Sequence, residues 1–170
     1  RFDILQFLED FGDNGQIDQA IPKSILAWPG KGNVEATYND DRYGQIIDLP
    51  DQPLAPFFDR NVNGIYEPRL GDYPIIRHDL AGVIPDELFW GVFNDAGNIH
   101  FESKADPIQA EIHLTAWAFN CAENELLNET IFTRHKIFNR SIESLDSMSI
   151  GLLVDADIGC SRDDNLGCDT

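Results

Sequence analysis

Two long runs of alternating side chains constrain the fold of this chain more than any other feature of its sequence. Apolar residues recur at every second position from Ile108 to Ala118 within the run Ile108–Cys121, and the run Thr130–Asn139 also alternates. A period of two is typical of a β-strand with one buried face, because successive side chains point to opposite sides of a sheet. The short polar connection Ala122–Glu125 predicts that the two runs form an antiparallel hairpin.

Several shorter segments are expected to add to this sheet. Leu88–Phe93 is an apolar run closed by the turn Asn94–Gly97, and Ile99–Phe101 is expected to begin its hairpin return. Phe2–Phe11 has apolar residues near helical spacing and is consistent with either a short helix or a pair of strands. A further strand is predicted at Ser147–Val154, with inward-facing Met148, Ile150, Leu152 and Val154. These segments predict a mainly β fold, an antiparallel β-sandwich with long ordered loops.

The distribution of proline and glycine along the chain suggests how this domain is organised. Prolines and glycines crowd the stretch from Pro22 to Pro56, which also carries Trp28 and Tyr38 and therefore reads as ordered loop over a core. We expect one domain over residues 1–170, with an irregular N-terminal part (1–56), an acidic loop (57–76) and a strand-rich core (86–170). The chain opens on Arg1 and closes directly after a motif, so we expect it to be a fragment of a longer protein.

The charge of the chain argues against two classes of partner. Its 12 Lys and Arg face 30 Asp and Glu, which gives a net charge of −18. Such a field repels phosphate backbones and anionic lipid surfaces, so nucleic acid is not expected as a partner. No stretch approaches the ~20 apolar residues that span a bilayer, so membrane insertion is not expected either. The acidic residues gather with Asn and Gly at 10–18, 39–41, 59–72 and 155–169, an arrangement that favours cation binding.

The segment Asp59–Asp72 is the strongest candidate for a calcium loop. Its side-chain oxygens alternate and a glycine follows them, as in the first half of an EF-hand loop. The acid expected at the twelfth position is replaced by Leu70, and Pro56 and Pro68 exclude flanking helices, so we predict an EF-like loop on a β scaffold. The alternative is an Asx-rich turn that only caps its own backbone. The candidate ligands are Asp59, Asn61, Asn63, the carbonyl of Ile65, Glu67 and Asp72.

A second calcium site is predicted at the end of the chain. Five aspartates crowd its last residues, where they would repel one another unless a cation or Arg162 lay among them. The candidate ligands are Asp155, Asp157, Asp163, Asp164 and Asp169. Cys160 and Cys168 flank part of this loop and are expected to form a disulfide, which favours an oxidising compartment. The alternative is a solvated acidic loop held by that disulfide, and Cys121 is either a free thiol or paired outside the chain.

No catalytic residue set stands out. The four histidines, His78, His100, His113 and His135, are far apart in sequence, although His113 and His135 lie on facing strands and could approach each other. Neither HExxH nor GxSxG occurs. Acid pairs for glycoside hydrolysis are too numerous to select one. Trp28, Trp90 and Trp117 could line a sugar platform, but Trp90 and Trp117 sit in apolar strands and are better explained as core.

A series of phrases resembles the N-terminal region of large secreted or cell-surface proteins of Bacteroidetes, which typically end in a sorting domain for type IX secretion. The phrases, in order, are Ile25–Asn33, Leu54–Asp59, Asn63–Pro68, Gly71–Pro74, Phe89–Asp95, Phe138–Ser141, Asp155–Gly159, Asp163-Asp164 and Gly167–Asp169. The resemblance implies an extracellular location and acids at Asp59, Asp72, Asp155, Asp157, Asp163 and Asp164, consistent with metal loops.

The expected function is therefore a calcium-stabilised structural or adhesive module of an exported bacterial surface protein. Its expected partners are calcium ions and surface glycans or other surface proteins. A carbohydrate-binding module or polysaccharide hydrolase domain is one alternative, and a subunit of an extracellular filament or surface layer is another. Enzymatic activity is not the favoured expectation.

Overall fold

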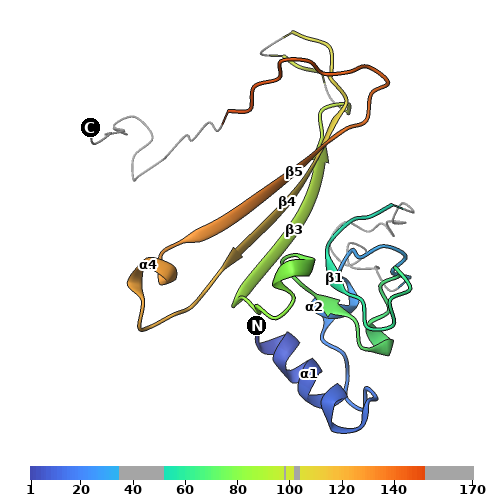
Figure 1. Ribbon diagram of the computed structural model, residues 1–170, viewed down its shortest axis with the longest axis vertical. Helices are drawn as coiled ribbons and strands as arrows, with labels where there is room; N and C mark the ends of the chain where they lie inside the picture. Colours follow the sequence, from blue (N-terminus) through green and yellow to red (C-terminus); the bar gives the residue numbers. More distant parts are fainter. Residues whose placement is uncertain (35–51, 98, 102–103, 152–170) are drawn as a thin grey trace. The chain divides into compact units, whose positions relative to one another are not determined.

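The computed structural model describes residues 1–34, 52–97, 99–101 and 104–151 (Figure 1). The chain divides into two compact units, Arg1–Arg140 and Ser141–Thr170. All of the helices and strands given below belong to the first unit. The second unit is described only over residues 141–151, where the hydroxyl of Ser141 accepts the N–H of Glu143 at 3.2 Å.

The chain begins with helix α1, Phe2–Asn14, which resolves the ambiguity of the first segment in favour of a helix. Ile4 and Phe7 lie one turn apart and are both buried, so the apolar stripe faces the interior. The helix ends at Gly15, whose φ of 77° is left-handed and whose N–H donates to the Phe11 carbonyl at 2.8 Å. A short helix, α2 (Lys23–Leu26), follows and buries Ile25.

A small two-stranded antiparallel sheet frames the acidic loop. Strand β1 (Phe57–Phe58) pairs with β2 (Tyr73–Pro74), so both ends of the intervening segment are fixed. The 3-10 helix η1 (Pro68–Leu70) lies within this segment, and η2 (His78–Leu80) follows β2. The Phe58 and Tyr73 rings stack at 5.0 Å, which adds a cross-strand contact to the short pairing.

The main sheet has three antiparallel strands in the order β3-β4-β5. Their bounds are Glu87–Asn94 for β3, Ala110–Ala118 for β4 and Ile131–Asn139 for β5. The predicted hairpin is confirmed as β4 and β5, which pair along their full lengths. The connection between them contains helix α4 (Glu125–Asn128), and the Asn124 side chain caps it by accepting the N–H of Leu127 at 3.2 Å.

Two predicted strands are wrong. Ile99–Phe101 forms no strand, because β3 pairs with β4 instead. Asp95 fixes that pairing, since its carboxylate accepts the N–H groups of Ile108 at 2.7 Å and Ala110 at 2.9 Å. Residues 147–151 also form no strand, and Met148 and Ile150, predicted to face inward, are exposed. Residues 152–154 of that prediction lie outside the described residues.

Two buried apolar clusters are present in the described part of the chain. One contains Ile4, Phe7, Ile25, Tyr73 and Ile75 and therefore joins helices α1 and α2 to strand β2. The other contains Trp28, Ala55, Phe57 and Tyr66, against which Leu88 and Trp90 of β3 pack. Both clusters are built from loops and helices as much as from strands.

The main sheet has two different faces. Trp90, Thr115 and Arg134 lie opposite one another in the register, and this face meets the Trp28 cluster through Trp90. The other face is apolar but open, with Phe89 at 59% exposure and Ile131 at 75%. The protein is therefore rich in antiparallel strands, with a smaller helical part.

Candidate functional site

The loop between β1 and β2 is folded around the side chain of Asp59. One carboxylate oxygen of Asp59 accepts the N–H of Asn63 at 3.2 Å, and the other accepts the N–H of Gly64 at 2.7 Å. These bonds bend the backbone back over the carboxylate. The alternating residues that follow can therefore direct their oxygens toward a common region.

Asn61, Asn63 and Glu67 close the same loop. Oδ1 of Asn61 accepts the N–H of Asn63 at 3.2 Å, and Oδ1 of Asn63 accepts the N–H of Ile65 at 2.8 Å. Both amide groups donate to one oxygen of Glu67, Asn61 at 3.1 Å and Asn63 at 2.6 Å. The structure thus connects Asp59, Asn61, Asn63 and Glu67, all predicted from the sequence, through hydrogen bonds.

Asp72 lies beneath this loop and is completely buried, at 0% exposure. Its two carboxylate oxygens accept the N–H groups of Arg60 and Glu67, each at 2.9 Å, so it joins the start of the loop to its end. Burial raises the pKa of Asp72 above its ordinary value, and the negative charges of Asp59 and Glu67 raise it further against these two hydrogen bonds. In the described residues, no cationic side chain forms an ion pair with Asp72.

The backbone of the loop adopts left-handed conformations at alternate residues. Val62 has a φ of 59° and Gly64 has a φ of 78°. This conformation is ordinary for glycine, but a β-branched residue such as valine adopts it at a cost. The side chain of Val62 is 85% exposed, so burial of that side chain does not offset the cost.

Gly71 brings the loop against helix α1. It has a φ of 98°, and a Cβ there would lie 2.6 Å from Nε of Arg60 and 2.7 Å from the Phe11 ring. The space left by the missing side chain is used by Arg60, whose guanidinium lies 4.1 Å from the centre of the Phe11 ring and donates to the Gly71 carbonyl at 3.3 Å. The acidic loop is thereby connected to the N-terminal helix.

The donor set of the loop suits a hard cation. Carboxylate and amide oxygens have two lone pairs each, so an oxygen that accepts one backbone N–H can still bind an ion. Asp59, Asn61, Asn63 and the carbonyl of Ile65 would supply such oxygens, with Glu67 beside them. Within the ranges that the structure describes, no group of three or more His, Cys, Asp or Glu side chains is arranged to hold a metal, so the two asparagines are essential to this candidate.

The second predicted calcium site lies outside the described residues. This applies to Asp155, Asp157, Asp163, Asp164 and Asp169, and to the predicted disulfide between Cys160 and Cys168. Cys121 lies within the described part, where it is a half-buried free thiol.

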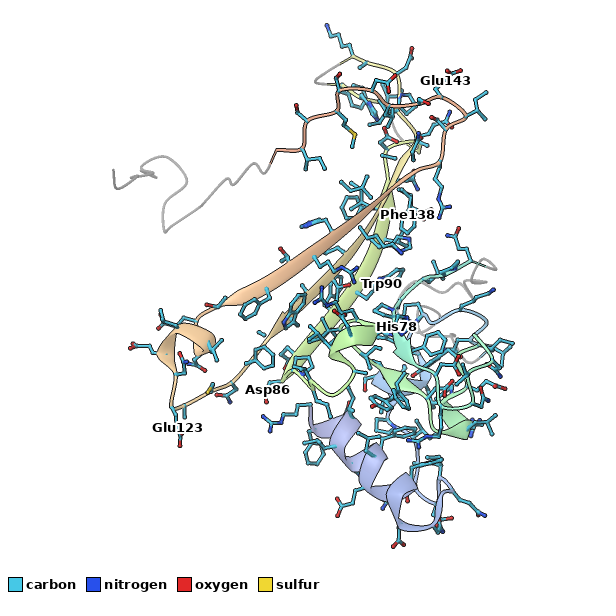
Figure 2. The ribbon with its side chains drawn as sticks, in the orientation of Figure 1. His78, Asp86, Trp90, Glu123, Phe138 and Glu143 are labelled. Atoms are coloured by element: carbon cyan, nitrogen blue, oxygen red, sulfur yellow. The ribbon has the colours of Figure 1, made fainter. Side chains whose placement is uncertain are left out.

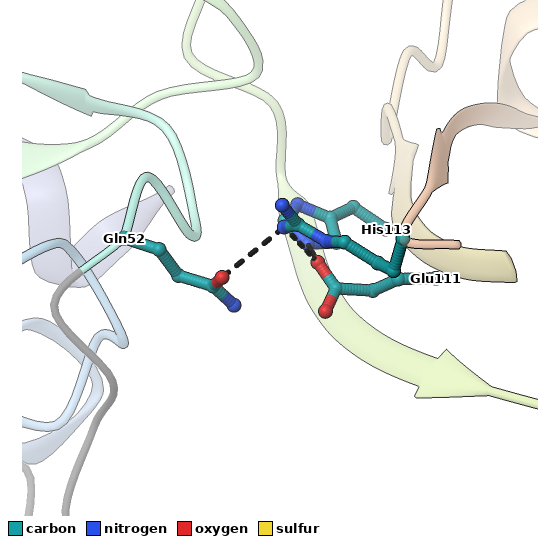
Figure 3. Close-up of polar contacts among 4 residues, drawn as sticks. Gln52, Glu111 and His113 are labelled. Carbon is teal, nitrogen blue, oxygen red and sulfur yellow. Dashed lines mark hydrogen bonds and ion pairs between the residues drawn. The ribbon is translucent and has the colours of Figure 1, made fainter. Parts of the chain in front are cut away.

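A polar cluster that sequence reasoning missed lies at the end of the main sheet (Figure 3). Glu111 Oε1 is 2.9 Å from Nε2 of the buried His113 and 2.6 Å from Nη2 of Arg140, which also donates to Gln52 at 3.1 Å. The hydrogen bond from Arg140 is the largest cause that lowers the pKa of Glu111. Only the spacing of Glu111 and His113, two residues apart on one strand, hinted at this cluster.

His113 and His135, which the predicted hairpin would have allowed to approach each other, do not do so. His113 lies opposite Lys136, and His135 lies opposite Leu114, so the two imidazoles project from opposite faces of the sheet. His113 instead contacts aromatic side chains, with its ring centre 5.1 Å from that of Trp90 and 4.7 Å from that of Phe138; these two partners are labelled in Figure 2.

The three tryptophans do not form a common platform. Trp28 is buried and donates to the Pro56 carbonyl at 2.9 Å, whereas Trp117 stacks on Phe132 at 5.7 Å. Trp90 contacts His113. A sugar-binding surface built from all three is therefore not present.

In the part of the chain that the structure describes, no helix is both long enough and apolar enough to cross a bilayer. Comparison of the chain with protein-family models, curated proteins and solved structures gave no match.

Proposed function

We propose that the chain is a calcium-stabilised structural or adhesive module. The observation that carries this proposal is the folding of Asp59, Asn61, Asn63 and Glu67 into one hydrogen-bonded loop above the buried carboxylate of Asp72. Three acidic side chains contribute to this region without a cationic partner among the described residues. A divalent cation would offset their mutual repulsion.

Calcium at this loop would stabilise more than the loop itself. The segment is anchored by the β1–β2 pairing at its ends and by Arg60 on the Phe11 ring of helix α1. A bound ion would therefore restrain the connection between the helical cluster and the strands. The aspartates at 155–169 would form the second calcium site, with Cys160 and Cys168 as its disulfide.

The resemblance to exported Bacteroidetes proteins supports a place for this module at the cell surface or outside the cell. An acidic, calcium-loaded domain suits such a setting, where calcium is abundant. Surface glycans or neighbouring surface proteins are its proposed partners. A carbohydrate-binding role is the second candidate, favoured by a cationic cavity described below.

The open face of the main sheet supports the sandwich architecture. Phe89, Phe93 and Ile131 project from this face with 59%, 49% and 75% of their surface exposed. An antiparallel sheet usually covers its apolar face, because burial stabilises by roughly 25 cal/mol per Å². We propose that a second sheet packs on this face.

The calcium proposal is tested by thermal unfolding in calcium and in chelator. At calcium roughly 100-fold above the dissociation constant, the free energy of unfolding should rise by about 2.7 kcal/mol per site. Asp59→Asn should remove this gain from the 59–72 loop, whereas Glu123→Gln, an exposed acid before helix α4, should leave it intact. Equal melting temperatures of the wild type in calcium and chelator would exclude the proposal. Asp157→Asn separates the contribution of the second site.

A further inference from the structure

A cavity of about 440 Å³ lies between the loops that precede the main sheet and the face of that sheet that carries Trp90. Its floor contains Trp90, Thr115 and Arg134, which are register partners on β3, β4 and β5, with His113 and Lys136 one pair further along. Residues 53–57 also line the cavity, as does His78 of η2, which is labelled in Figure 2. This volume falls in the range of about 300–1,000 Å³ typical of small-molecule sites.

The charge of this cavity is opposite to that of the protein. Four of the chain's 12 Lys and Arg line it, although the whole chain has a net charge of −18. The described lining contains one carboxylate, that of Asp59. The four cations are Lys31, Arg77, Arg134 and Lys136, and the imidazoles of His78 and His113 also line the cavity.

Two of these cations are available to a ligand. Arg77 is already paired with Asp79 at 2.7 Å, but in the described part of the chain Arg134 forms no ion pair. The Lys136 ammonium lies 4.6 Å from the centre of the Phe138 ring, and among the described residues no ion pair joins it to a carboxylate. Arg134 and Lys136 are two residues apart on β5 and therefore project from the same face.

We infer that this cavity binds the carboxylate of an acidic sugar, such as a uronate residue of a surface glycan. Arg134 and Lys136 would pair with the carboxylate, and the cationic lining outweighs the distant negative surface because charges beyond about 8 Å are screened at physiological salt. Thr115, His78 and His113 offer polar groups to ring hydroxyls. Leu54, Phe57 and Trp90 give the cavity an apolar side that suits the C–H face of a sugar ring.

This inference goes beyond the structural role proposed above and stands without it. Asp59 and Gly64 belong both to the cavity lining and to the calcium loop, so binding is measured in calcium and again in chelator. Saturable binding in chelator supports the cavity even if calcium has no effect on unfolding. A failure of the calcium proposal, seen in unfolding, can therefore be distinguished from a failure of the sugar proposal, seen in binding.

The test is calorimetric titration of the chain with galacturonate and glucuronate. Saturable binding is expected, and Arg134→Gln and Lys136→Gln should each weaken it by about tenfold, the effect of one charged hydrogen bond. Both side chains are exposed, so both variants are expected to fold. Lys104→Gln removes an exposed positive charge outside the cavity and should bind like the wild type.

Titration with other ligands distinguishes an acidic sugar from neutral sugars and from other anions. Galactose and the methyl ester of galacturonate lack the charge and should bind at least tenfold more weakly than the acid, by the same reasoning. Equal binding of the ester, a matching loss in Lys104→Gln, or no binding of either uronate would overturn the proposal. Inorganic phosphate or sulfate binding as tightly as the uronates would also overturn it, because a general anion site needs no sugar. The same holds for an acidic peptide that binds more tightly than both uronates.

Discussion

The carboxylate of Glu111 and the guanidinium of Arg140 are 2.6 Å apart at the junction of β4 and the end of β5. Glu111 is on the first of these strands and Arg140 directly follows the second, so their ion pair fastens the open end of the β4–β5 hairpin. The N–H of Arg140 also donates to the carbonyl of Gln109 at 2.9 Å. Side chain and backbone thus fix the same junction.

This pair predicts a stability that depends on pH. The pKa of Glu111 is lowered below its ordinary value of 4.5, so its contribution is present above that value and is lost as the pH falls through the lower folded-state pKa. Glu111→Gln should reduce the free energy of unfolding by about 1 kcal/mol at neutral pH, a value kept small because Arg140 is partly exposed.

Urea unfolding of wild type and Glu111→Gln from pH 7 down to pH 3 provides the measurement. The difference between the two proteins should shrink as the pH falls below about 4, near the unfolded value for glutamate. Glu87→Gln, an exposed acid on β3, is the control and should track the wild type. A difference that grows on acidification contradicts the assigned role of the pair.

The strained residue Val62 gives a second prediction. Asn tolerates its φ of 59° better than valine does, so Val62→Asn should raise the free energy of unfolding by about 1 kcal/mol in chelator. For a domain of this size the melting temperature should rise by roughly 2–4 °C. Val83→Asn, at an exposed valine without positive φ, should give no rise. Stabilisation by both substitutions would show that replacing an exposed apolar side chain with a polar one, rather than relieving backbone strain, is responsible.

The part of the fold that the sequence predicted well is the part that depends on local periodicity. The strands β4 and β5 alternate over their whole length and were predicted as a hairpin, whereas the apolar spacing of Phe2–Phe11 left a helix and a pair of strands both open, and the structure has helix α1. The sequence did not predict which distant segments pair with each other. The partner of β3 is set by Asp95 binding the backbone of residues 108 and 110, and no periodic signal encodes such a bond.

The candidate functional residues also fall into a group that local sequence spacing predicts and a group that it does not. Asp59, Asn61, Asn63 and Glu67 follow a local spacing rule and are joined in one loop. The cluster of Gln52, Glu111 and Arg140 brings together residues 88 positions apart, and the cationic cavity combines residues from 31 to 136. Those neighbours meet through the register of the sheet and through the loops that pack beside it, neither of which a single sequence defines.

Gly71 supports a third prediction. A methyl group there would meet Arg60 at 2.6 Å and the Phe11 ring at 2.7 Å, in a backbone conformation that disfavours any side chain. Gly71→Ala should therefore cost about 2–4 kcal/mol. Gly82→Ala, where nothing lies within 4 Å and φ is not positive, should be close to neutral. Chemical denaturation of both variants measures the contrast, and equal stabilities would argue against close packing of the loop on helix α1.

The buried amide of Asn33 supports a fourth prediction. Its Nδ2 donates to the carbonyls of Leu26 at 2.8 Å and Trp28 at 2.7 Å, so it satisfies the backbone where helix α2 ends. Asn33→Ala should cost about 1–3 kcal/mol, because buried carbonyls lose their donor.

Asn33→Asp keeps the shape but turns a carboxylate oxygen toward those carbonyls, so it should destabilise more than alanine at neutral pH. Protonation gives that oxygen a hydrogen to donate, so the deficit of Asn33→Asp should narrow in acid while that of Asn33→Ala stays constant. Denaturation of both variants at pH 7 and pH 4 measures this, and an Asp variant as stable as wild type at pH 7 would mean that the amide is not the donor that holds this turn.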